Sequence, residues 1–283
     1  MTVEPPVVSP ATLSEALALM SAGEYRPLAG GTDLMVQLEA DLAEPPAAVL
    51  DLSRLSELKG VSTDGYDVTV GALTTYTVLR HSPVIGARLP ALAEAAATVG
   101  AAQIQNRGTI GGNICNASPA GDSLPVLLAV DATFDVGSAG GERAVPAREF
   151  WTGYRQTALR DDELLLRVHF PVERARRTLF RKVGTRAAQA ISKVVIALSY
   201  REDGGTWRDV RLALGSVAPT TIRAPKTEAI LEGSRPGESV TGAAAATLAS
   251  EIAPIDDVRS TADYRRSVSA RVLHRLLREE GGW

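Results

Sequence analysis

Two glycine pairs stand among short hydrogen-bonding side chains, in RPLAGGTDLMV (26–36) and in RGTIGGNICNASPAGD (107–122). A Gly-Gly pair lets the backbone reach positive φ and brings its N–H groups close to a ligand with no Cβ in the way, which suits a diphosphate. The polar residues beside the pairs are Thr32, Asp33, Thr109, Asn113, Ser118 and Asp122. They are not strong nucleophiles with a neighbouring base, so they indicate recognition of hydroxyls and phosphates by a cofactor cradle.

Neither segment has the spacing of a known single-loop nucleotide motif. The G-x-G-x-x-G of a dinucleotide fold and the G-x-x-x-x-G-K-[ST] of a P-loop are both absent from them. A tight turn is the alternative interpretation for either pair taken alone, because glycine is first a turn residue. Together, the two similar segments favour one shared nucleotide ligand.

The remaining composition excludes several other kinds of chemistry. One cysteine, Cys115, cannot form a disulfide or an iron–sulfur site within this chain, and the isolated His81, His169 and His274 lack metal-ligand spacing. The formal charge is −3, which gives no positive field for nucleic acid. The N-terminal stretch lacks a basic region before an apolar run, and no run approaches the ~20 residues of a membrane helix, so we expect a cytoplasmic protein.

The glycine segments must be positioned by the elements around them. A length of 283 residues with 45% apolar residues allows a sizeable core and two domains, or one domain with an appendage. The patterns predict a helix capped by Ser9-Pro10 and ended by Gly23, and a second helix at 89–100 with Gly100 as its cap. Strands are expected before the first glycine pair, at 47–53, in two parts over 57–73 across Asp64-Gly65, at the end of 123–137 after a helix, and at 161–171.

The charged segment 172–178 marks a domain boundary, which we place near 173. Beyond it, 181–219 predicts long strands around the turn at 203–205, followed by helices near 224–232, 241–252 and 261–279. Because strands and helices do not alternate regularly, the pattern favours an α+β fold over a doubly wound parallel sheet.

Four motifs in collinear order resemble one known family. They are LAGGTDLMV, TIGGNICNASPAGDSLPVLLAVDA, WTGYRQTALRDDELLLRVHFP and FRKVGTRAAQAISKV. Together they resemble the FAD-binding medium subunit of the molybdenum hydroxylases, the xanthine dehydrogenase and carbon monoxide dehydrogenase family. The resemblance implies a two-part FAD-binding domain of the vanillyl-alcohol oxidase (PCMH) type over 1–172, split near 57, and a smaller α+β domain of the CO dehydrogenase flavoprotein type over 173–283.

The resemblance also implies which residues hold the cofactor. In this family both glycine segments close on one FAD and hold its diphosphate and neighbouring groups largely through backbone donors. The matching residues are Leu28, Ala29, Gly30, Gly31, Thr32, Asp33, Leu34, Met35, Thr109, Gly111, Gly112 and Asn113. Ser118 and Asp122 match positions that contact hydroxyls of FAD, and Leu165 and Lys182 match positions beside the isoalloxazine ring.

Several of these residues have a simpler alternative interpretation. Leu165 lies on an apolar strand and is also explained as a core residue, and Lys182 as a solvated charge. A lysine near the flavin would favour the reduced anionic form, at an edge that the sequence does not specify. For Cys115 a small buried residue is favoured over a redox-active thiol. The arginines of the last helix, including Arg265, are expected on a solvated face rather than at a partner interface.

The implied function is electron transfer without a catalytic residue of its own. The complete enzyme would hydroxylate an N-heterocycle or aldehyde at molybdopterin in a large subunit and pass electrons through 2Fe–2S clusters of a small subunit to FAD in this chain, and then to NAD or another acceptor. A dimer of heterotrimers is the expected assembly. Gly-Gly-Thr-Asp in place of the Gly-Gly-His-Ser of carbon monoxide dehydrogenases argues against carbon monoxide as substrate. A self-sufficient flavin oxidase and a subunit that has lost FAD are the rival hypotheses.

Overall fold

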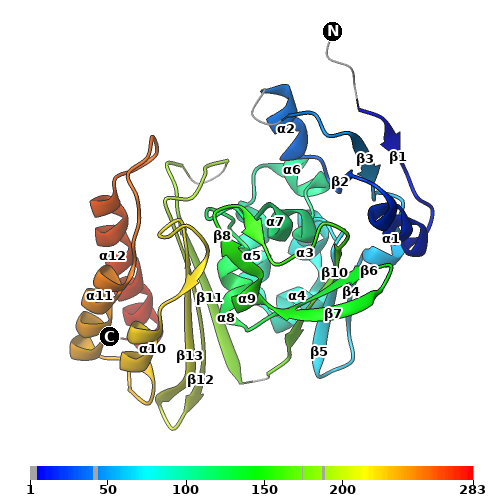
Figure 1. The fold of residues 1–283 in the computed structure, drawn as a ribbon. Helices are drawn as coiled ribbons and strands as arrows, with labels where there is room; N and C mark the ends of the chain where they lie inside the picture. Colours follow the sequence, from blue (N-terminus) through cyan, green and yellow to red (C-terminus); the bar gives the residue numbers. More distant parts are fainter. Residues whose placement is uncertain (1–4, 41–43, 174, 187–188, 283) are drawn as a thin grey trace.

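The computed structural model describes residues 5–40, 44–173, 175–186 and 189–282. Their strands form a small parallel sheet, a five-stranded sheet, a four-stranded sheet and a two-stranded hairpin (Figure 1). Helices and sheets occupy separate layers, as expected for an α+β fold. Within these residues no helix is both long enough and apolar enough to cross a membrane.

The first sheet presents the first glycine pair at its edge. Its order is β1–β3–β2, all parallel, with β1 (Val7–Val8), β2 (Tyr25–Leu28) and β3 (Ala48–Asp51). Helix α1 (Leu13–Ala22) connects β1 to β2 and ends at Gly23 as predicted. Its N-cap is Thr12 rather than the predicted Ser9, because the Thr12 hydroxyl accepts the Glu15 N–H, whereas Ser9 donates to Asp51.

The second sheet supports most of the helices of the first half. Its order is β4–β5–β10–β6–β7, with β4 (Val61–Thr63), β5 (Asp67–Gly71), β6 (Thr133–Ser138), β7 (Gly141–Pro146) and β10 (Leu164–Pro171). The strands at 57–73 and 161–171 were therefore predicted correctly. A short 3-10 helix, Ser56–Leu58, leads into β4, and the hairpin of β8 (Trp151–Gly153) and β9 (Gln156–Thr157) precedes β10.

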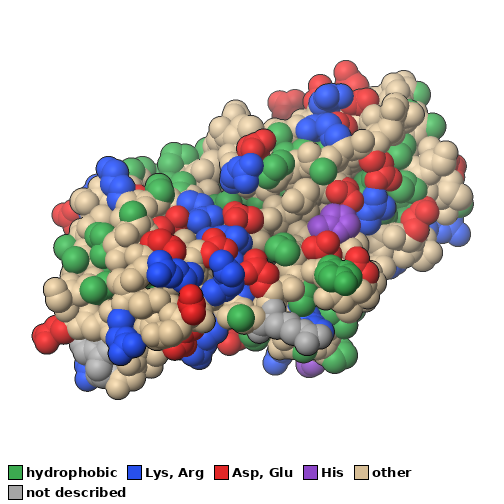
Figure 2. All heavy atoms as spheres, turned by 90° about the horizontal axis from the view of Figure 1, so that it is seen from below, with side chains coloured by type: hydrophobic (Ala, Val, Ile, Leu, Met, Phe, Trp, Pro, Cys, Tyr) green, Lys and Arg blue, Asp and Glu red, His purple; other side chains and the backbone are tan. Residues whose placement is uncertain are grey.

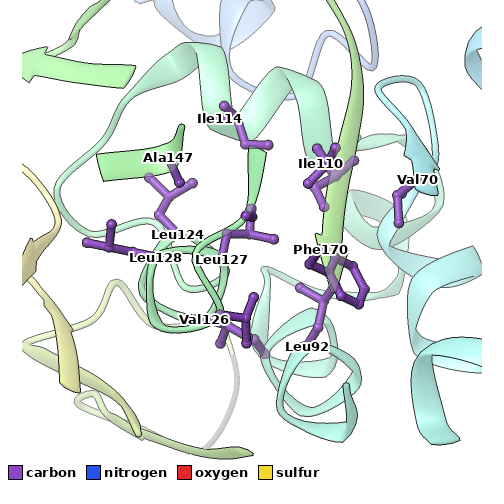
Figure 3. Close-up of a cluster of buried hydrophobic side chains, with 14 of the residues drawn as sticks. Val70, Leu92, Ile110, Ile114, Leu124, Val126, Leu127, Leu128, Ala147 and Phe170 are labelled. Atoms are coloured by element: carbon purple, nitrogen blue, oxygen red, sulfur yellow. The ribbon is translucent and has the colours of Figure 1, made fainter. Parts of the chain in front are cut away.

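Seven helices of the described chain lie between β5 and β8. They are α3 (Tyr76–His81), α4 (Pro83–Arg88), α5 (Pro90–Thr98), α6 (Ala102–Arg107), α7 (Ile110–Asn116), α8 (Leu124–Ala129) and α9 (Ala147–Phe150). Ile110 and Ile114 of α7 point into the same buried cluster as Leu124 and Leu127 of α8 (Figure 3). This cluster fixes the side of α7 that carries the second glycine pair.

The third sheet is antiparallel and covered by the last three helices. It has the order β11–β12–β13–β14, with β11 (Arg176–Val183), β12 (Val194–Asp203), β13 (Thr206–Gly215) and β14 (Ile222–Arg223). Helices α10 (Pro225–Leu231), α11 (Glu238–Glu251) and α12 (Ala262–Gly281) pack on one face, close to their predicted places (Figure 1).

The other face of the third sheet packs against the first half of the chain. Phe180, Val195, Ala197 and Ala213 belong to the same core cluster as α5 and α8. Ion pairs also cross this junction, since the Asp131 carboxylate lies 3.1 Å from both the Arg211 and the Arg223 guanidinium. On the face seen in Figure 2, acidic and basic side chains intermingle and form no extended field of one sign.

The expectation of a solvated arginine face on α12 is wrong for Arg265. Its side chain is 5% exposed and donates two hydrogen bonds of 2.8 Å to the Asp257 carboxylate. It also donates to the Ser216 carbonyl oxygen at 2.7 Å and to that of Lys193 at 3.2 Å. A buried guanidinium with this many acceptors is a structural anchor rather than a solvated charge.

Candidate functional site

The two glycine segments lie against each other. A Cβ built on Gly30 would stand 2.0 Å from the Arg107 carbonyl oxygen, and one on Gly108 would stand 3.3 Å from the Thr32 hydroxyl. The loop after β2 therefore packs on the connection between α6 and α7 at a distance that only glycine permits. Two segments more than 70 residues apart in sequence thus form one surface.

The first segment is a true loop with a left-handed glycine. Gly31 has φ +74° and leads into the short helix α2 (Leu34–Glu39). Among the described residues nothing accepts a hydrogen bond from the backbone N–H of Gly30, Gly31 or Thr32. Loop N–H groups without a partner in the chain are the kind of donor that an anionic group binds.

The chain before and after that turn contributes both contacts and open surface. Leu28 closes β2, and Ala29 lies 3.9 Å from the position that a Gly112 Cβ would take. The Asp33 carboxylate accepts a hydrogen bond from Gln37 and lies 3.7 Å from the Arg155 guanidinium. Leu34 begins α2, and Met35 is 55% exposed.

The second glycine pair lies in a helix, which corrects the expectation of a loop. The Thr109 hydroxyl caps α7 by accepting the Gly112 N–H at 3.0 Å, and the Gly111 N–H donates to the Ala72 carbonyl oxygen at 2.8 Å. The N–H groups of Ile110 and Asn113 also donate within the chain, to Thr74 and Thr109. These N–H groups therefore already have acceptors within the chain, and their contact with a phosphate stays a prediction.

In this helix, glycine is needed for close approach to the neighbouring backbone and not for a positive φ. A Cβ on Gly111 would meet the Ala72 carbonyl oxygen at 2.6 Å, whereas Gly112 is exposed and faces the first segment. The Asn113 amide oxygen accepts from the Ser123 hydroxyl at 3.0 Å and lies 3.2 Å from the Cβ position of Gly121. Asn113 thus links the glycine surface to the next turn, which carries Asp122.

Asp122 and Lys182 form a buried ion pair between the two halves of the chain. The Lys182 Nζ donates to Asp122 Oδ2 at 2.5 Å and to the Thr98 carbonyl oxygen at 3.0 Å. Thr98 Oγ1 also donates to Asp122 Oδ2, at 3.1 Å, and the Ser192 hydroxyl donates to Oδ1. The side chains of Asp122 and Lys182 are only 7% and 12% exposed, so the solvated-charge interpretation of Lys182 is wrong.

Asp122 and Lys182 each keep some hydrogen-bonding capacity beyond their contacts with one another and with the chain. Burial raises the pKa of the Asp122 carboxyl, while the charge of Lys182 and the three hydrogen bonds oppose that rise. A carboxylate has about four acceptor positions and an ammonium three donors, so about one acceptor on Asp122 and one donor on Lys182 remain. The pair can therefore meet a ligand that offers a hydroxyl and a carbonyl close together.

The other predicted residues take different positions. Leu165 pairs with Val136 between β10 and β6 and is 6% exposed, so its packing is that of a core residue. Ser118 is half-buried, and its hydroxyl accepts the Ala120 N–H at 3.3 Å. Cys115 is half-buried against the core, and burial raises the pKa of its thiol to about 12, as expected for a packing residue.

Sequence reasoning missed several contributors to this region. Thr98 and Ser192 complete the shell of Asp122, and the only signal for Ser192 was its place in the family-like AISKV run. Arg155 reaches both glycine segments, since its guanidinium donates to the Asn116 amide oxygen at 2.7 Å and lies near Asp33. Contacts between residues this distant in sequence have no local pattern that would reveal them.

Two family models match consecutive parts of the chain. The model described as the FAD binding domain in molybdopterin dehydrogenase matches residues 2–173. The model of the CO dehydrogenase flavoprotein C-terminal domain matches residues 180–280.

Relatives from several organisms are similar over nearly their whole length. The glyceraldehyde dehydrogenase medium chain of Sulfolobus acidocaldarius is 35% identical over 95% of each chain. The carbon monoxide dehydrogenase medium chain of Hydrogenophaga pseudoflava is 33% identical over 95% of this chain and 94% of its own. A solved structure of the enzyme from that organism matches with a TM-score of 0.93 at 32% identity, covering 97% of this chain and 96% of the other.

A third relative is named for another substrate. The solved structure of quinoline 2-oxidoreductase from Pseudomonas putida 86 matches with a TM-score of 0.93 at 27% identity, over 99% of this chain and 98% of the other. Identities this close to one another do not separate the substrate classes.

Proposed function

This chain belongs to the FAD-binding medium subunits of the molybdenum hydroxylases, and on that premise we propose where it holds FAD and between which partners it transfers electrons. When bound, FAD supplies the ability to accept and release electrons singly or in pairs. The protein supplies binding, orientation and charge. The chain is thus an oxidoreductase subunit rather than the place where an organic substrate reacts.

The diphosphate of FAD lies on the surface where the glycine segments meet. Support comes from the N–H groups of Gly30, Gly31 and Thr32, which have no acceptor among the described residues, and from the exposed Gly112 opposite them. The first segment donates, and the helical second segment offers an exposed position without a side chain at Gly112. The proposed FAD contacts are Leu28, Ala29, Gly30, Gly31, Thr32, Asp33, Leu34, Met35, Thr109, Gly111, Gly112, Asn113, Ser118, Asp122, Leu165 and Lys182.

Asp122 and Lys182 hold the part of FAD nearest the flavin. The remaining acceptor of Asp122 would suit a ribityl or ribose hydroxyl of FAD, and the remaining donor of Lys182 would suit a carbonyl of the isoalloxazine ring. The lysine charge would favour negative charge developing on that ring. Leu165 is proposed beside the ring on the family resemblance, and in the structure its side chain is buried in the core.

Electrons enter from iron–sulfur clusters of a small subunit, after hydroxylation at molybdopterin in a large subunit. NAD is the proposed acceptor, and a dimer of heterotrimers the proposed assembly. An N-heterocycle or an aldehyde is the proposed substrate class, and relatives named for quinoline and for glyceraldehyde are among those that the chain resembles. The Gly-Gly-Thr-Asp of the first segment supports these classes over carbon monoxide.

We also propose that the chain divides near residue 173, with a first domain of two parts split near 57. The first two sheets take their strands from residues up to 171, and the third takes its strands from residue 176 onward. Limited proteolysis that cuts first near 173 and yields two compact fragments supports this division. A first cut within either proposed domain contradicts it.

The buried Asp122–Lys182 pair beside the joined glycine segments is the observation that carries the FAD site. Equilibrium titration of the purified full chain with FAD tests it directly. We expect one FAD per chain, with a shifted visible flavin spectrum. Purification from the native host tests the partners, because subunits that carry molybdopterin and iron–sulfur centres are expected to elute with the chain. A chain that takes up no FAD contradicts the proposal.

A further inference from the structure

A chain of buried hydrogen bonds reaches Asp122 from the last helix. The Ser192 hydroxyl donates to Asp122 Oδ1, and the Ser192 carbonyl oxygen accepts the Ser216 hydroxyl at 2.9 Å. The Ser216 carbonyl oxygen in turn accepts Nη1 of Arg265 at 2.7 Å. The path thus runs from α12 through two serines to the carboxylate.

Each member of this chain is held in place on more than one side. Ser192, Ser216 and Arg265 are 1%, 7% and 4% exposed. Ser216 has φ +66°, a conformation that costs a non-glycine residue free energy and persists only where the surroundings impose it. Here its N–H donates to the Pro119 carbonyl oxygen at 2.7 Å, across the junction of the two halves.

Among the described residues, Ser192 is the only one that donates a hydrogen bond to Asp122 Oδ1. Lys182 and Thr98 both bind Oδ2, so Ser192 alone restrains Oδ1. The last torsion of an aspartate is broad, and loss of this restraint lets the carboxylate rotate about it. Rotation moves the free acceptor of Asp122 and, through the ion pair, the free donor of Lys182.

We propose that Ser192, Ser216 and Arg265 are positioning residues for FAD, which they serve by fixing the orientation of the Asp122 carboxylate. The inference rests on the proposed function, because it requires FAD to bind at Asp122 and Lys182. In this proposal the C-terminal helix α12 influences the cofactor site through Arg265, although the helix does not contact the cofactor. Specificity for the flavin end of FAD then depends on residues of both halves of the chain.

The test is a double-mutant cycle of FAD affinity in the full chain, with Ser192→Ala, Asp122→Asn and their combination. Loss of one hydrogen bond to a charged group predicts that Ser192→Ala alone weakens FAD binding about tenfold. In the Asp122→Asn background the same change has an effect below about twofold, because its target is already altered. The control is Ser199→Ala, which removes another fully buried serine, one bound to Arg176 rather than Asp122, and leaves the affinity unchanged.

A second measurement separates positioning from simple stabilisation. The reduction potential of bound FAD shifts in Ser192→Ala in the same direction as in Lys182→Met, and stays unchanged in Ser199→Ala. If Ser192→Ala fails to fold, Arg265→Lys replaces it and shows the same shift, because lysine lacks the fork that binds both Asp257 and Ser216.

The outcomes distinguish this inference from the function on which it rests. The positioning role is overturned if Ser192→Ala weakens FAD binding equally in the wild-type and Asp122→Asn backgrounds. It is also overturned if Ser192→Ala has the FAD affinity and reduction potential of the wild type. In both cases the proposal that this chain binds FAD stands. Failure of the wild-type chain to bind FAD overturns both.

Discussion

At the scale of single residues, Lys182 shows how far sequence reasoning reaches. The family-like run FRKVG located it, but its alternative role as a solvated charge could not be excluded from the sequence. Its partner Asp122 lies 60 residues away and in the other half of the chain. No local spacing links the two, so the ion pair follows only from the packing of the third sheet on α5 and α8.

Removal of one member of this pair gives a pH-dependent prediction. Lys182→Met leaves Asp122 buried without a cation, so we expect the free energy of unfolding to fall by about 3–5 kcal/mol at neutral pH. The loss is largest where Asp122 is ionised. It shrinks as the pH falls, because protonation removes the uncompensated charge and the pKa of Asp122 is already raised by burial.

Urea unfolding of wild type and variant at neutral and acidic pH measures this difference. The control is Lys226→Met, which removes an exposed lysine from α10 and is expected to change stability by less than about 0.5 kcal/mol. A deficit in Lys182→Met that stays constant from neutral to acidic pH would contradict the ion-pair account.

At the scale of elements, α7 is the main difference between expectation and structure. Two adjacent glycines lower helix propensity by about 1 kcal/mol each, so a loop was the reasonable prediction. Tertiary packing outweighs that cost, because Ile110 and Ile114 lie one turn apart and enter the core while Thr109 caps the helix (Figure 3). Strands and the last three helices were easier to predict, since their periodicity is local and unbroken.

The exposed position of Gly112 on α7 leads to a prediction about FAD binding. Gly112→Val places a branched side chain between α7 and the first glycine segment, so we expect FAD binding to weaken at least about tenfold. The C-terminal domain stays folded because its core lies elsewhere. Gly86→Val is the matched control, since Gly86 also lies in a helix and a Cβ there meets nothing within 4 Å.

Fluorescence titration with FAD and a thermal unfolding curve check both parts. Wild-type affinity in Gly112→Val would remove this helix face from the cofactor site. Loss of affinity in Gly86→Val as well would show that the effect is not specific to α7.

The contact between the two glycine segments gives a prediction about stability. Gly30→Ala forces a Cβ to within 2.0 Å of the Arg107 carbonyl oxygen, so the loops must separate at a cost of about 1–3 kcal/mol. Gly237→Ala adds the same methyl group at a position where nothing lies within 4 Å and serves as the control. Chemical denaturation measures both, and equal stabilities of the two variants would show that the loops do not need this approach.

At the scale of the whole molecule, the two halves act as one structure although their sheets are separate. Phe180 and Val195 of the third sheet belong to the core of the first half, and Asp131 joins Arg211 and Arg223 across the junction. The sequence predicted the α+β class from the irregular order of its strands and helices, and the family from collinear motifs that span nearly the whole chain. It could not predict that the Asp122–Lys182 pair, where we propose that the flavin end of FAD binds, spans the junction, since that depends on how two sheets dock.

In the proposed function, this chain carries electrons through FAD but does not itself oxidise the organic substrate. Its single cysteine cannot supply the set of thiolate ligands that a 2Fe–2S cluster needs. The rival hypothesis, a self-sufficient flavin oxidase, requires substrate and FAD to react within this chain alone.

Anaerobic spectroscopy of the isolated, FAD-loaded chain tests this claim most directly. We expect the visible flavin absorbance to persist when purines, other N-heterocycles or aldehydes are added, and to bleach with dithionite. Addition of the molybdopterin and iron–sulfur subunits makes the bleaching depend on the organic substrate. Stoichiometric bleaching by an organic substrate in the lone chain, free of molybdenum and iron, would contradict the account and establish the self-sufficient oxidase.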